Sequence, residues 1–502
     1  MVNTVIFDDQ IKLWWDYTKL QDKNSYSVYL GDKKLGETTA THFNVKELDG
    51  DTEYTLTVKL EDGKGGVLKE IGTVTAKTLK TRIRLDVTKA PYNAVGDGVT
   101  MNTKAIQQAI DDCKDGECVY IPDGTFMTGG LMLHSDMELR LSDNAVLQGS
   151  EHREDYLPKI KSRFEGYECI CYRSFINLGD LDHDDGYNCK NVIIRGGTMF
   201  GGGKALRDDI IEYEKSFFQE ETRKAGGTED EIYSFDNNVV LPGRTRGRCM
   251  QIANSQNVII ADTICGKGAS WQLHFIYSDN IVTCGCKIIS GGINNGDGWD
   301  PDSATNCVVF DTEFITGDDC VAIKSGKNPE GNEINRPTIG VKVFDCIANG
   351  GFGIAIGSEM AGGVKDVKIW NCKLINTWGG INVKAPPERG AFVTDVEAYN
   401  VLCPSISVVQ RYRGNHGTKP APHPPILRNF TFEDITVTGI CFYNNKYELS
   451  SAVSFFGGEE EEYKIHNVKL KNIRMKHRTL APYQDMKFDN VVNVTMEDII
   501  SE

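Results

Sequence analysis

The sequence lacks the features that would place the protein in a membrane or in an oxidising compartment. Its first residues, MVNTVIFDDQIKLWWDY, contain no basic segment followed by an apolar run, and no stretch of the 502 residues approaches the length of a membrane span. The fifteen cysteines are an odd number, and most lie inside apolar segments rather than at the spacings of a disulfide framework. We therefore expect a soluble, unexported, cytoplasmic protein with reduced thiols.

Positive charge is scarce as well. The chain has 55 Lys and Arg against 71 Asp and Glu, a formal net charge of -16. This balance argues against a nucleic-acid partner, and without a membrane span we expect no membrane partner. It also gives no long-range attraction for an acidic polymer, so local basic residues must hold any acidic substrate. The sequence does not indicate the oligomeric state.

Two Cys-x-Cys pairs deserve a separate test as metal ligands. These are Cys169 with Cys171 and Cys284 with Cys286, and neither has a histidine or a second cysteine pair at a ligand spacing. We expect no metal and no cofactor.

With 40% hydrophobic residues, a chain of this length can bury a large core and is expected to hold two or more domains. Residues 1–80 alternate in short apolar runs separated by turn residues such as Gly31-Asp32, which predicts a small antiparallel β-sandwich. The runs cover residues 11–15, 26–30, 54–60 and 67–76.

This first segment resembles a fibronectin type III module. The resemblance is carried by an early tryptophan (Trp14 or Trp15), by the segment SYSVYL, and by a later pattern formed of Leu48, Thr52, Tyr54, Leu56 and Val58. It shows no catalytic constellation, so we expect a spacer or a wall beside an active site.

The texture changes at residue 81. A strand, a turn and an amphipathic helix over 102–110 come first, and such a helix can cap an open sheet end. A short β-type phrase then recurs at irregular intervals without intervening helices, which predicts a solenoid over residues 81–502. We interpret it as a right-handed parallel β-helix, giving an all-β protein, because a propeller would need four strands per unit and strong hairpin turns. The copies are NVIIRGGTM at 191, NVIIADTIC at 257, NIVTCGCKI at 280, NCVVFDTEF at 306, GVKVFDCIA at 340, DVKIWNCKL at 366, DVEAYNVLC at 395, NFTFEDITV at 429 and NVKLKNIRM at 467.

Each repeat also contains a second segment, and stacking these segments brings acidic residues together. In the register that we expect, the segments are SWQLHFIYS (270–278), NGDGWDPDS (295–303), GDDCVAIKS (317–325), GGFGIAIGS (350–358) and WGGINVKAP (378–386). Parallel strands lie about 4.8 Å apart, so Asp297 and Asp319 become neighbours in one column. Asp318 precedes that column, and His274 is expected to flank the cluster.

Three carboxylates on neighbouring rungs suit acid–base chemistry. One of them, kept protonated by its negative neighbours, can donate to a leaving oxygen while the others hold and deprotonate a water molecule. That division of labour is inverting glycoside hydrolysis. A calcium site or a solvated acidic turn are the alternatives for this motif taken by itself.

From about residue 82 to 500 the chain resembles the polygalacturonase family, glycoside hydrolase family 28. The resemblance rests on Asn-x-Asp (Asp297), Gly-Asp-Asp (Asp318 and Asp319), Gly-x-Gly and a later x-x-Lys (Lys384), in this order on a β-helix. It implies that Asp318 is the general acid and that Asp297 and Asp319 position and activate water. It also implies substrate binding by Lys384 and by Tyr412.

Two positions depart from the family pattern. Gly-His-Gly is replaced by a motif centred on Phe352, and the arginine of Arg-x-Lys is replaced by Asn382. Losing this bidentate cation suggests an altered sugar subsite marked by Phe352 and Asn382. Arg411 and Arg413, which flank Tyr412, are candidates to replace the lost guanidinium. A long polar segment, 201–248, could close one end of the groove, as in exo-acting members, or could be a solvated helix.

Three hypotheses follow from these patterns. The leading one is an exo-acting, inverting hydrolase of galacturonate-containing pectin oligosaccharides. A hydrolase of rhamnogalacturonan or another decorated pectin is the second, and a non-catalytic polysaccharide-binding β-helix is the third. Retention of all three aspartates argues against the last.

Overall fold

The computed structural model describes residues 1–21, 23–183, 186–234, 243–412, 416–443, 446–476 and 485–501. The chain divides into two compact units, one of Met1–Leu85 with Lys114–Cys118 and one of Asp86–Cys113 with Val119–Glu502. None of the helices in these described stretches is both long enough and apolar enough to cross a membrane.

The N-terminal unit is a small β-sandwich, as the sequence predicts. One sheet has the strand order β1-β2-β5 and the other β4-β3-β6-β7, with antiparallel pairing in both. The strands are β1 (Val2–Ile6), β2 (Gln10–Trp15), β3 (Ser25–Leu30), β4 (Lys33–Thr38), β5 (His42–Lys46), β6 (Glu53–Glu61) and β7 (Val67–Lys77).

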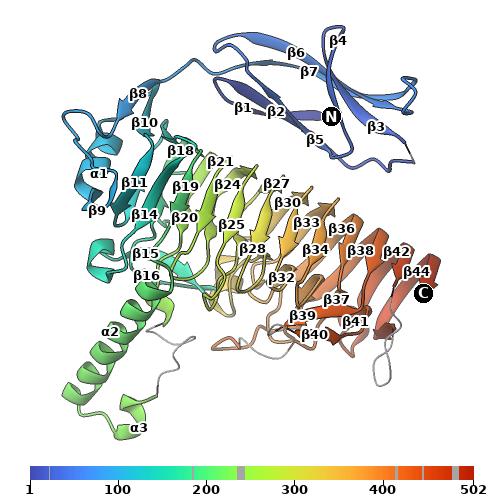
Figure 1. Cartoon of the computed structure of the whole chain (residues 1–502). Helices are drawn as coiled ribbons and strands as arrows, with labels where there is room; N and C mark the ends of the chain where they lie inside the picture. Colours follow the sequence, from blue (N-terminus) through green and yellow to red (C-terminus); the bar gives the residue numbers. More distant parts are fainter. Residues whose placement is uncertain are drawn as a thin grey trace. The chain divides into compact units, whose positions relative to one another are not determined.

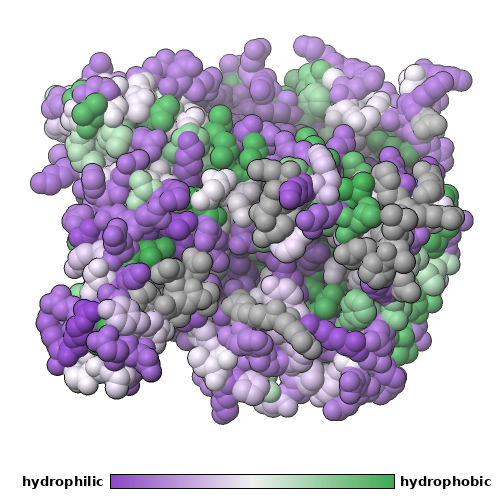
Figure 2. Space-filling view, turned by 60° about the horizontal axis from the view of Figure 1, so that its bottom comes forward, coloured by the Kyte–Doolittle hydropathy of each residue, from purple (hydrophilic) through white to green (hydrophobic). Residues whose placement is uncertain are grey.

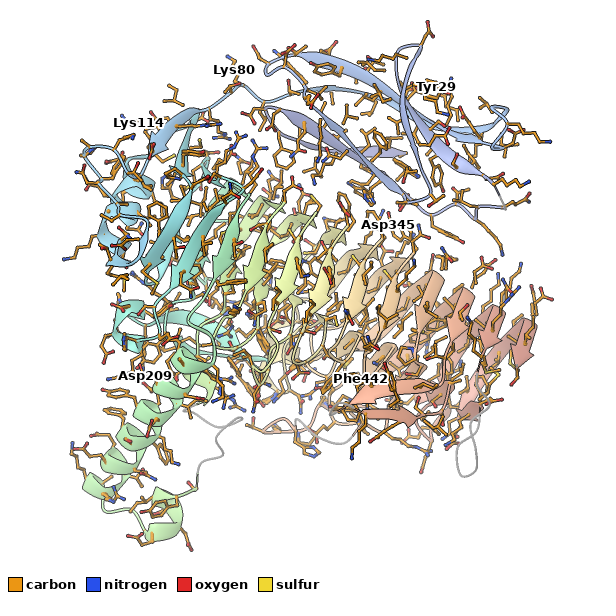
Figure 3. The ribbon with its side chains drawn as sticks, viewed as in Figure 1. Tyr29, Lys80, Lys114, Asp209, Asp345 and Phe442 are labelled. Atoms are coloured by element: carbon orange, nitrogen blue, oxygen red, sulfur yellow. The ribbon has the colours of Figure 1, made fainter. Side chains whose placement is uncertain are left out.

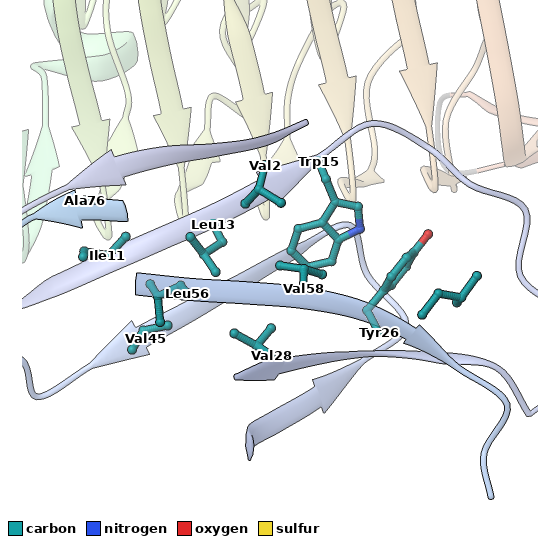
Figure 4. Close-up of a cluster of buried hydrophobic side chains, with 11 residues drawn as sticks. Val2, Ile11, Leu13, Trp15, Tyr26, Val28, Val45, Leu56, Val58 and Ala76 are labelled. Atoms are coloured by element: carbon teal, nitrogen blue, oxygen red, sulfur yellow. The ribbon is translucent and has the colours of Figure 1, made fainter. Parts of the chain in front are cut away.

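Inward-facing side chains of both sheets form the core of this unit (Figure 4). Trp15 and Tyr26 meet edge-to-face with ring centroids 5.0 Å apart, and both are fully buried. Leu56 and Val58 alternate along β6 with the exposed Thr55 and the half-buried Thr57, which is the period of two expected of a sandwich strand. The core therefore comes from the same apolar runs that the sequence pattern marks.

The second unit is the predicted right-handed parallel β-helix, whose coils stack from β10 to β44 (Figure 1). One sheet of 11 strands receives one strand from each coil, and this sheet carries the site described below. Its strands are β12 (Leu131–Leu133), β17 (Ile176–Leu178), β20 (Met250–Ala253), β23 (Leu273–Ile276), β26 (Trp299–Asp302), β29 (Val321–Ile323), β32 (Ile354–Gly357), β35 (Ile381–Lys384), β37 (Ile406–Val409), β41 (Val453–Phe456) and β43 (Met486–Asp489).

The remaining coil strands form one 22-stranded sheet, mostly as pairs joined at a short bend. They are β8 (Ile83–Asp86), β9 (Asp97–Met101), β10 (Glu117–Ile121), β11 (Gly124–Thr128), β13 (Glu138–Leu141), β14 (Ala145–Gly149), β18 (Cys189–Arg195), β19 (Thr198–Phe200), β21 (Ser255–Ala261), β22 (Ile264–Gly266), β24 (Asp279–Cys284), β25 (Lys287–Ile289), β27 (Val308–Phe310), β28 (Glu313–Ile315), β30 (Thr338–Phe344), β31 (Ile347–Asn349), β33 (Val364–Trp370), β34 (Lys373–Ile375), β36 (Phe392–Cys403), β38 (Ile426–Val437), β42 (Ile465–Met475) and β44 (Val491–Ser501).

Short hairpins and helices complete this unit. The hairpins are β15 (Ile160–Phe164) with β16 (Tyr167–Cys171) and β39 (Ile440–Tyr443) with β40 (Lys446–Leu449). The helices are α1 (Thr103–Asp112), α2 (Gly203–Lys224), α3 (Glu229–Ile232) and α4 (Glu330–Ile334), with short 3-10 turns η1 (Arg153–Tyr156), η2 (Gly243–Thr245) and η3 (Glu461–Tyr463).

The asparagine that opens many of the repeated phrases has a structural reason. Asn191, Asn257 and Asn280 have φ values of 57°, 58° and 53°, a left-handed conformation that asparagine tolerates better than most residues. Their side chains form a row, because Asn257 donates to Asn191 Oδ1 at 2.9 Å and Asn280 donates to Asn257 Oδ1 at 2.8 Å. The phrase therefore starts each coil at the same corner.

Inside the coils, the repeated phrases place similar side chains on top of one another. The rings of Phe310 and Phe344 are 5.0 Å apart, and those of Phe344 and Trp370 are 4.3 Å apart, with interplanar angles of 4° and 3°. The next residue, such as Asp345 (Figure 3), makes the bend and accepts a hydrogen bond from Asn371 Nδ2 at 2.9 Å. Aromatic stacking inside the coil and side-chain hydrogen bonds at the bend thus fix the register between successive coils.

The long polar segment 201–248 contains α2 and α3. The base of α2 is attached to the β-helix, since Arg153 Nη1 lies 2.9 Å from Asp209 Oδ1 (Figure 3) and Tyr172 donates to Glu214 at 2.8 Å. The helix predicted at 102–110 is α1, and its Gln107 donates to the Met132 carbonyl at 2.9 Å.

Candidate active site

The register of the 11-stranded sheet places two of the predicted aspartates side by side. Trp299 of β26 pairs with Val321 of β29, so Asp297 lies level with Asp319, as the predicted column requires. The expected register fails one rung earlier, where Leu273 and not His274 is the partner of Trp299. A slip of one residue exchanges the two faces of a strand. Trp271 therefore lies level with Asp297.

These residues line a cleft of about 230 Å³. All three predicted catalytic aspartates are in its lining, together with the predicted binding residues Lys384 and Tyr412. The full lining is Glu165, Trp271, Asn295, Asp297, Asp318, Asp319, Lys324, Gly357, Ser358, Glu359, Lys384 and Tyr412.

Each of the two level aspartates has its own lysine. Lys384 Nζ donates to both carboxylate oxygens of Asp319, at 2.9 and 2.7 Å. Lys324 Nζ donates to Asp297 Oδ2 at 2.9 Å and sits 4.3 Å above the centre of the Trp271 ring. Within the described residues, no group of three or more His, Cys, Asp or Glu is arranged to hold a metal ion. Lysines, then, balance the charge of this acidic cluster.

Asp318 has the environment of a general acid. Burial, and then the negative charges of Asp297 and Asp319, raise the pKa of its carboxyl well above the ordinary value. One of its oxygens accepts the backbone N–H of Asp319 at 3.0 Å. A proton therefore stays on Asp318 at pH values where ordinary aspartates are ionised, which makes it able to protonate a leaving oxygen.

Asp319 is held differently, although burial also raises its pKa. The ammonium group of Lys384 opposes that shift and favours the charged form. The pKa of Lys384 itself is raised by Asp319 and Asp318, which outweigh the effect of burial, so the lysine remains a cation. The two adjacent carboxyl groups thus have different environments, because Lys384 binds Asp319 directly and opposes the rise of its pKa; separate environments for two carboxyl groups are what acid–base catalysis requires.

A further aspartate, Asp300, is fully buried behind Asp297. Burial and the Asp297 charge raise its pKa well above the ordinary range. Lys324 Nζ lies 3.6 Å from Asp300 Oδ1 and 3.6 Å from Glu359 Oε2. Lys324 is therefore shared among three carboxyl groups.

The predicted substrate contact of His274 is not found. Its imidazole is completely buried, with Nε2 3.2 Å from Asp302 Oδ2 and its ring against Trp271. Burial lowers its pKa to about 4 despite the hydrogen bond to Asp302, so the ring is neutral. His274 pairs with Asp300 in the sheet, and the β15–β16 hairpin covers this part of the strand, where its Arg163 binds the same Asp302 at 3.0 Å.

Phe352 and Asn382 also lie outside the cleft lining. Phe352 shares the column of Asp297 and Asp319, but its ring packs edge-to-face on Trp378, with centroids 4.8 Å apart. Asn382 donates to the Phe352 carbonyl at 3.3 Å. The pair forms a contact beside the cleft rather than part of its wall.

The arginines that could replace the missing guanidinium have other partners. Arg411, half-exposed, makes an ion pair with Asp489 at 2.7 Å, away from the cleft lining. Arg413 lies outside the described residues. Arg246 and Arg248 at the end of the polar segment are buried, and Arg246 Nη2 donates to Asn295 Oδ1 at 2.8 Å. Arg246 thereby supports the loop that carries Asp297.

Sequence reasoning missed Lys324, Trp271, Glu165, Ser358 and Glu359 in the lining. For Lys324 a signal existed, because it lies in the segment GDDCVAIKS and faces the same way as Lys384 in the period-of-two pattern. The sequence contains no such signal for Glu165, because this residue reaches the cleft only through the fold of the β15–β16 hairpin.

Comparison with known proteins agrees with this geometry. The family model described as "Glycosyl hydrolases family 28" matches residues 234–441, the stretch that contains all three aspartates and Lys384. The chain carries a family 28 glycoside hydrolase domain. A second model, "Rhamnogalacturonase A/epimerase, pectate lyase-like", matches residues 88–164.

Among curated relatives, an exo-poly-alpha-D-galacturonosidase of Dickeya chrysanthemi is 26% identical over 472 residues, covering 89% of this chain and 77% of that protein. A probable polygalacturonase of Vitis vinifera is 29% identical over 373 residues, covering 70% of this chain and 68% of that one.

The fold agrees with that of a solved relative, the family 28 exopolygalacturonase of Yersinia enterocolitica. The TM-score is 0.79 at 22% identity, with 100% of this chain and 98% of that chain covered. A hyperthermoactive exopolygalacturonase from Thermotoga maritima gives a TM-score of 0.63 at 23% identity over 84% of this chain and 91% of that one. The family 28 domain therefore has the expected architecture.

Proposed function

We propose that the protein is an inverting, exo-acting hydrolase of galacturonate-containing pectin oligosaccharides. The observation that carries the proposal is the position of Asp318 in the cleft lining beside two aspartates that each bind a lysine, where burial and their negative charges raise its pKa. The names of the relatives support the substrate class and the exo mode.

In the proposed reaction, Asp318 gives its proton to the glycosidic oxygen as the bond to the anomeric carbon breaks. A water molecule held by Asp297 and Asp319 attacks the opposite face of that carbon and gives up a proton to one of them. Because water attacks the face opposite the leaving group in a single displacement, the product has inverted configuration.

Substrate binding falls to Lys384 and Tyr412, which reach the cleft from neighbouring parts of the β-helix. The ammonium group of Lys384 pairs with Asp319. The lysine side chain is 19% exposed, so it is accessible to a carboxylate or hydroxyl of the sugar. Burial raises the pKa of Tyr412, which therefore stays a neutral hydrogen-bonding group.

A second candidate is hydrolysis of rhamnogalacturonan or another decorated pectin. The specific observation in its favour is the replacement of the family arginine by Asn382, which cannot neutralise a carboxylate. The model that matches residues 88–164 also has rhamnogalacturonase in its description. A non-catalytic polysaccharide-binding role is the third candidate, and the presence of all three aspartates in the cleft lining argues against it.

The deciding experiment is a reducing-sugar assay on oligogalacturonides beside rhamnogalacturonan oligosaccharides, with product size read by chromatography. We expect monogalacturonate as the early product from oligogalacturonides, and an inverted anomeric signal by proton NMR. Release of mixed oligomers would contradict the exo mode, and activity on rhamnogalacturonan alone would favour the second candidate. No turnover on any of these substrates by the folded protein would leave only binding.

We also propose that the enzyme works in the cytoplasm on imported oligosaccharides, and that the N-terminal unit is a fibronectin type III-like module. All fifteen cysteines are unbonded, which suits a reducing compartment. Two antiparallel sheets of three and four strands support the module.

A further inference from the structure

The β15–β16 hairpin covers the outer face of the sheet at the active site and is held there at several points. Ser162 donates to Gln251 at 2.6 Å, Arg163 pairs with Asp302 at 3.0 Å, and the Phe164 ring stacks on Trp271 at 4.9 Å. These contacts bring the turn of the hairpin to the cleft, so its position is set by the fold.

The turn consists of Glu165 and Gly166, with φ values of 47° and 81°. Glycine, asparagine and aspartate are the usual residues of such a turn, because a left-handed backbone is strained for other side chains. Backbone conformation alone therefore does not favour a glutamate at this position. We look for the reason in what its side chain contacts.

That side chain is buried, 5% of the residue being exposed, and it lines the cleft beside Glu359 and Ser358. Its Oε2 has no hydrogen-bond partner in the structure. The nearest cations, Arg244 Nη2 at 3.6 Å and Lys327 Nζ at 4.0 Å, are too far for hydrogen bonds. A buried acceptor without a donor is costly, and the carboxyl group that contains it belongs to a residue of the cleft lining, where substrate would lie.

The hydroxyl groups of a sugar are suitable hydrogen-bond donors for the Glu165 carboxylate. Carboxylates accept hydrogen bonds from hydroxyl groups, and such charge-assisted bonds are among the stronger ones. A uronate carboxylate at the same point would be repelled, so the side of the ring that faces Glu165 is a hydroxyl-bearing side. Arg244 and Lys327 keep the glutamate electrostatically tolerable without occupying Oε2.

We propose that Glu165 binds hydroxyl groups of the sugar ring in the cleft and so orients that ring against Asp318. This inference rests on the proposed glycosidase function, and it adds a specificity residue from outside the sheet that supplies the catalytic aspartates.

The test compares Glu165→Gln and Glu165→Ala with the parent in hydrolysis of oligogalacturonides. We expect KM to rise about tenfold to a hundredfold, as loss of a hydrogen bond to a charged group implies. Affinity for digalacturonate, measured by calorimetry in an Asp318→Asn background, should fall by a similar factor. Glu154→Gln, a change at a glutamate whose side chain is 58% exposed on η1, is the matched control and should leave KM unchanged.

Thermal unfolding separates recognition from a structural role. Burial raises the pKa of Glu165, so keeping its carboxylate ionised at neutral pH costs folding free energy. Glu165→Gln removes that cost and should unfold at the same or a higher temperature. A lower unfolding temperature with unchanged KM and affinity would overturn the inference. Hydrolysis by the parent with unaltered kinetics in both variants would also overturn it while leaving the proposed function standing. A parent with no activity on oligogalacturonides would overturn both.

Discussion

The two sheets of the β-helix solve different problems. In the 22-stranded sheet the buried columns are apolar, as in the stack of Phe310, Phe344 and Trp370, and the polar asparagine rows lie at the exposed corners. The outer face of the 11-stranded sheet instead buries charged groups such as Lys324 and Asp300. The first sheet stabilises the coil, whereas the second holds ionisable groups in an environment that changes their pKa values.

Buried charges are a poor source of stability, because removing them from water costs about as much as their attraction returns. Lys324 is an example, because its buried ammonium charge is compensated by three carboxyl groups, those of Asp297, Asp300 and Glu359. Such clusters are typical of functional sites, where shifted pKa values are the useful property. The contrast predicts that changes in one sheet alter activity and changes in the other alter stability.

The largest effect is expected from Asp318→Asn. Removing the acid should lower kcat on the order of a thousandfold or more, since acid catalysis contributes about 10² to 10⁴. The raised pKa of Asp318 means that its ionised form destabilises the fold as pH rises above the ordinary aspartate range. Thermal unfolding at neutral pH should therefore give an equal or higher midpoint. Near-parental turnover on a natural substrate would remove Asp318 from its assigned role.

In the other sheet, Trp370→Ala should cost about 3–5 kcal/mol of unfolding free energy, because it opens a cavity in a stacked, fully buried column. Chemical denaturation measures this loss. Activity per folded molecule should stay within about twofold, since Trp370 lies outside the cleft lining. Trp378→Ala is the control, because Trp378 is 42% exposed and should cost much less. A collapse of kcat in folded Trp370→Ala would break the separation between the sheets.

Lys384→Met should change both binding and the pH profile. Burial raises the pKa of Asp319 and Lys384 opposes this, so without the lysine the pKa rises further. The ionised base is then lost at a higher pH, and the acid limb of kcat/KM should move upward by about one pH unit. KM should rise about tenfold through loss of a substrate cation. Lys373→Met, at an exposed lysine on β34, should leave both unchanged, and an unmoved acid limb in Lys384→Met would contradict the pairing.

The smallest effect is expected from Phe352→His with Asn382→Arg, which restores the family pattern. The sequence alone suggests that these changes raise activity on linear oligogalacturonides relative to the native substrate. Their positions beside the cleft reduce that expectation to a change of about threefold or less in the ratio of kcat/KM for the two substrates, because neither side chain lines the cleft. A change well above tenfold in a folded double mutant would show that the pair reads the sugar after all.

Much of the fold could be predicted because it is local and periodic. The phrases from NVIIRGGTM onward mark the coil strands, and the spacing of Asp297 and Asp319 puts them level across β26 and β29. The sequence also separates the β-sandwich from the β-helix through their different turn spacing. These features follow from backbone geometry and side-chain alternation, which act over a few residues.

The tertiary structure alone decided which side chains meet at the cleft. A single-residue difference in register brought Trp271 level with Asp297, and the β15–β16 hairpin, through Arg163, reaches the same Asp302 that the buried His274 binds. Loop length sets that register, and no short-range pattern encodes it. Glu165 enters the site from a hairpin far away in the sequence, and Lys324 acquires its place only when Asp297, Asp300 and Glu359 surround it. The sequence by itself determined the coil and its aspartates, whereas the balance of charge around them depends on contacts between distant segments.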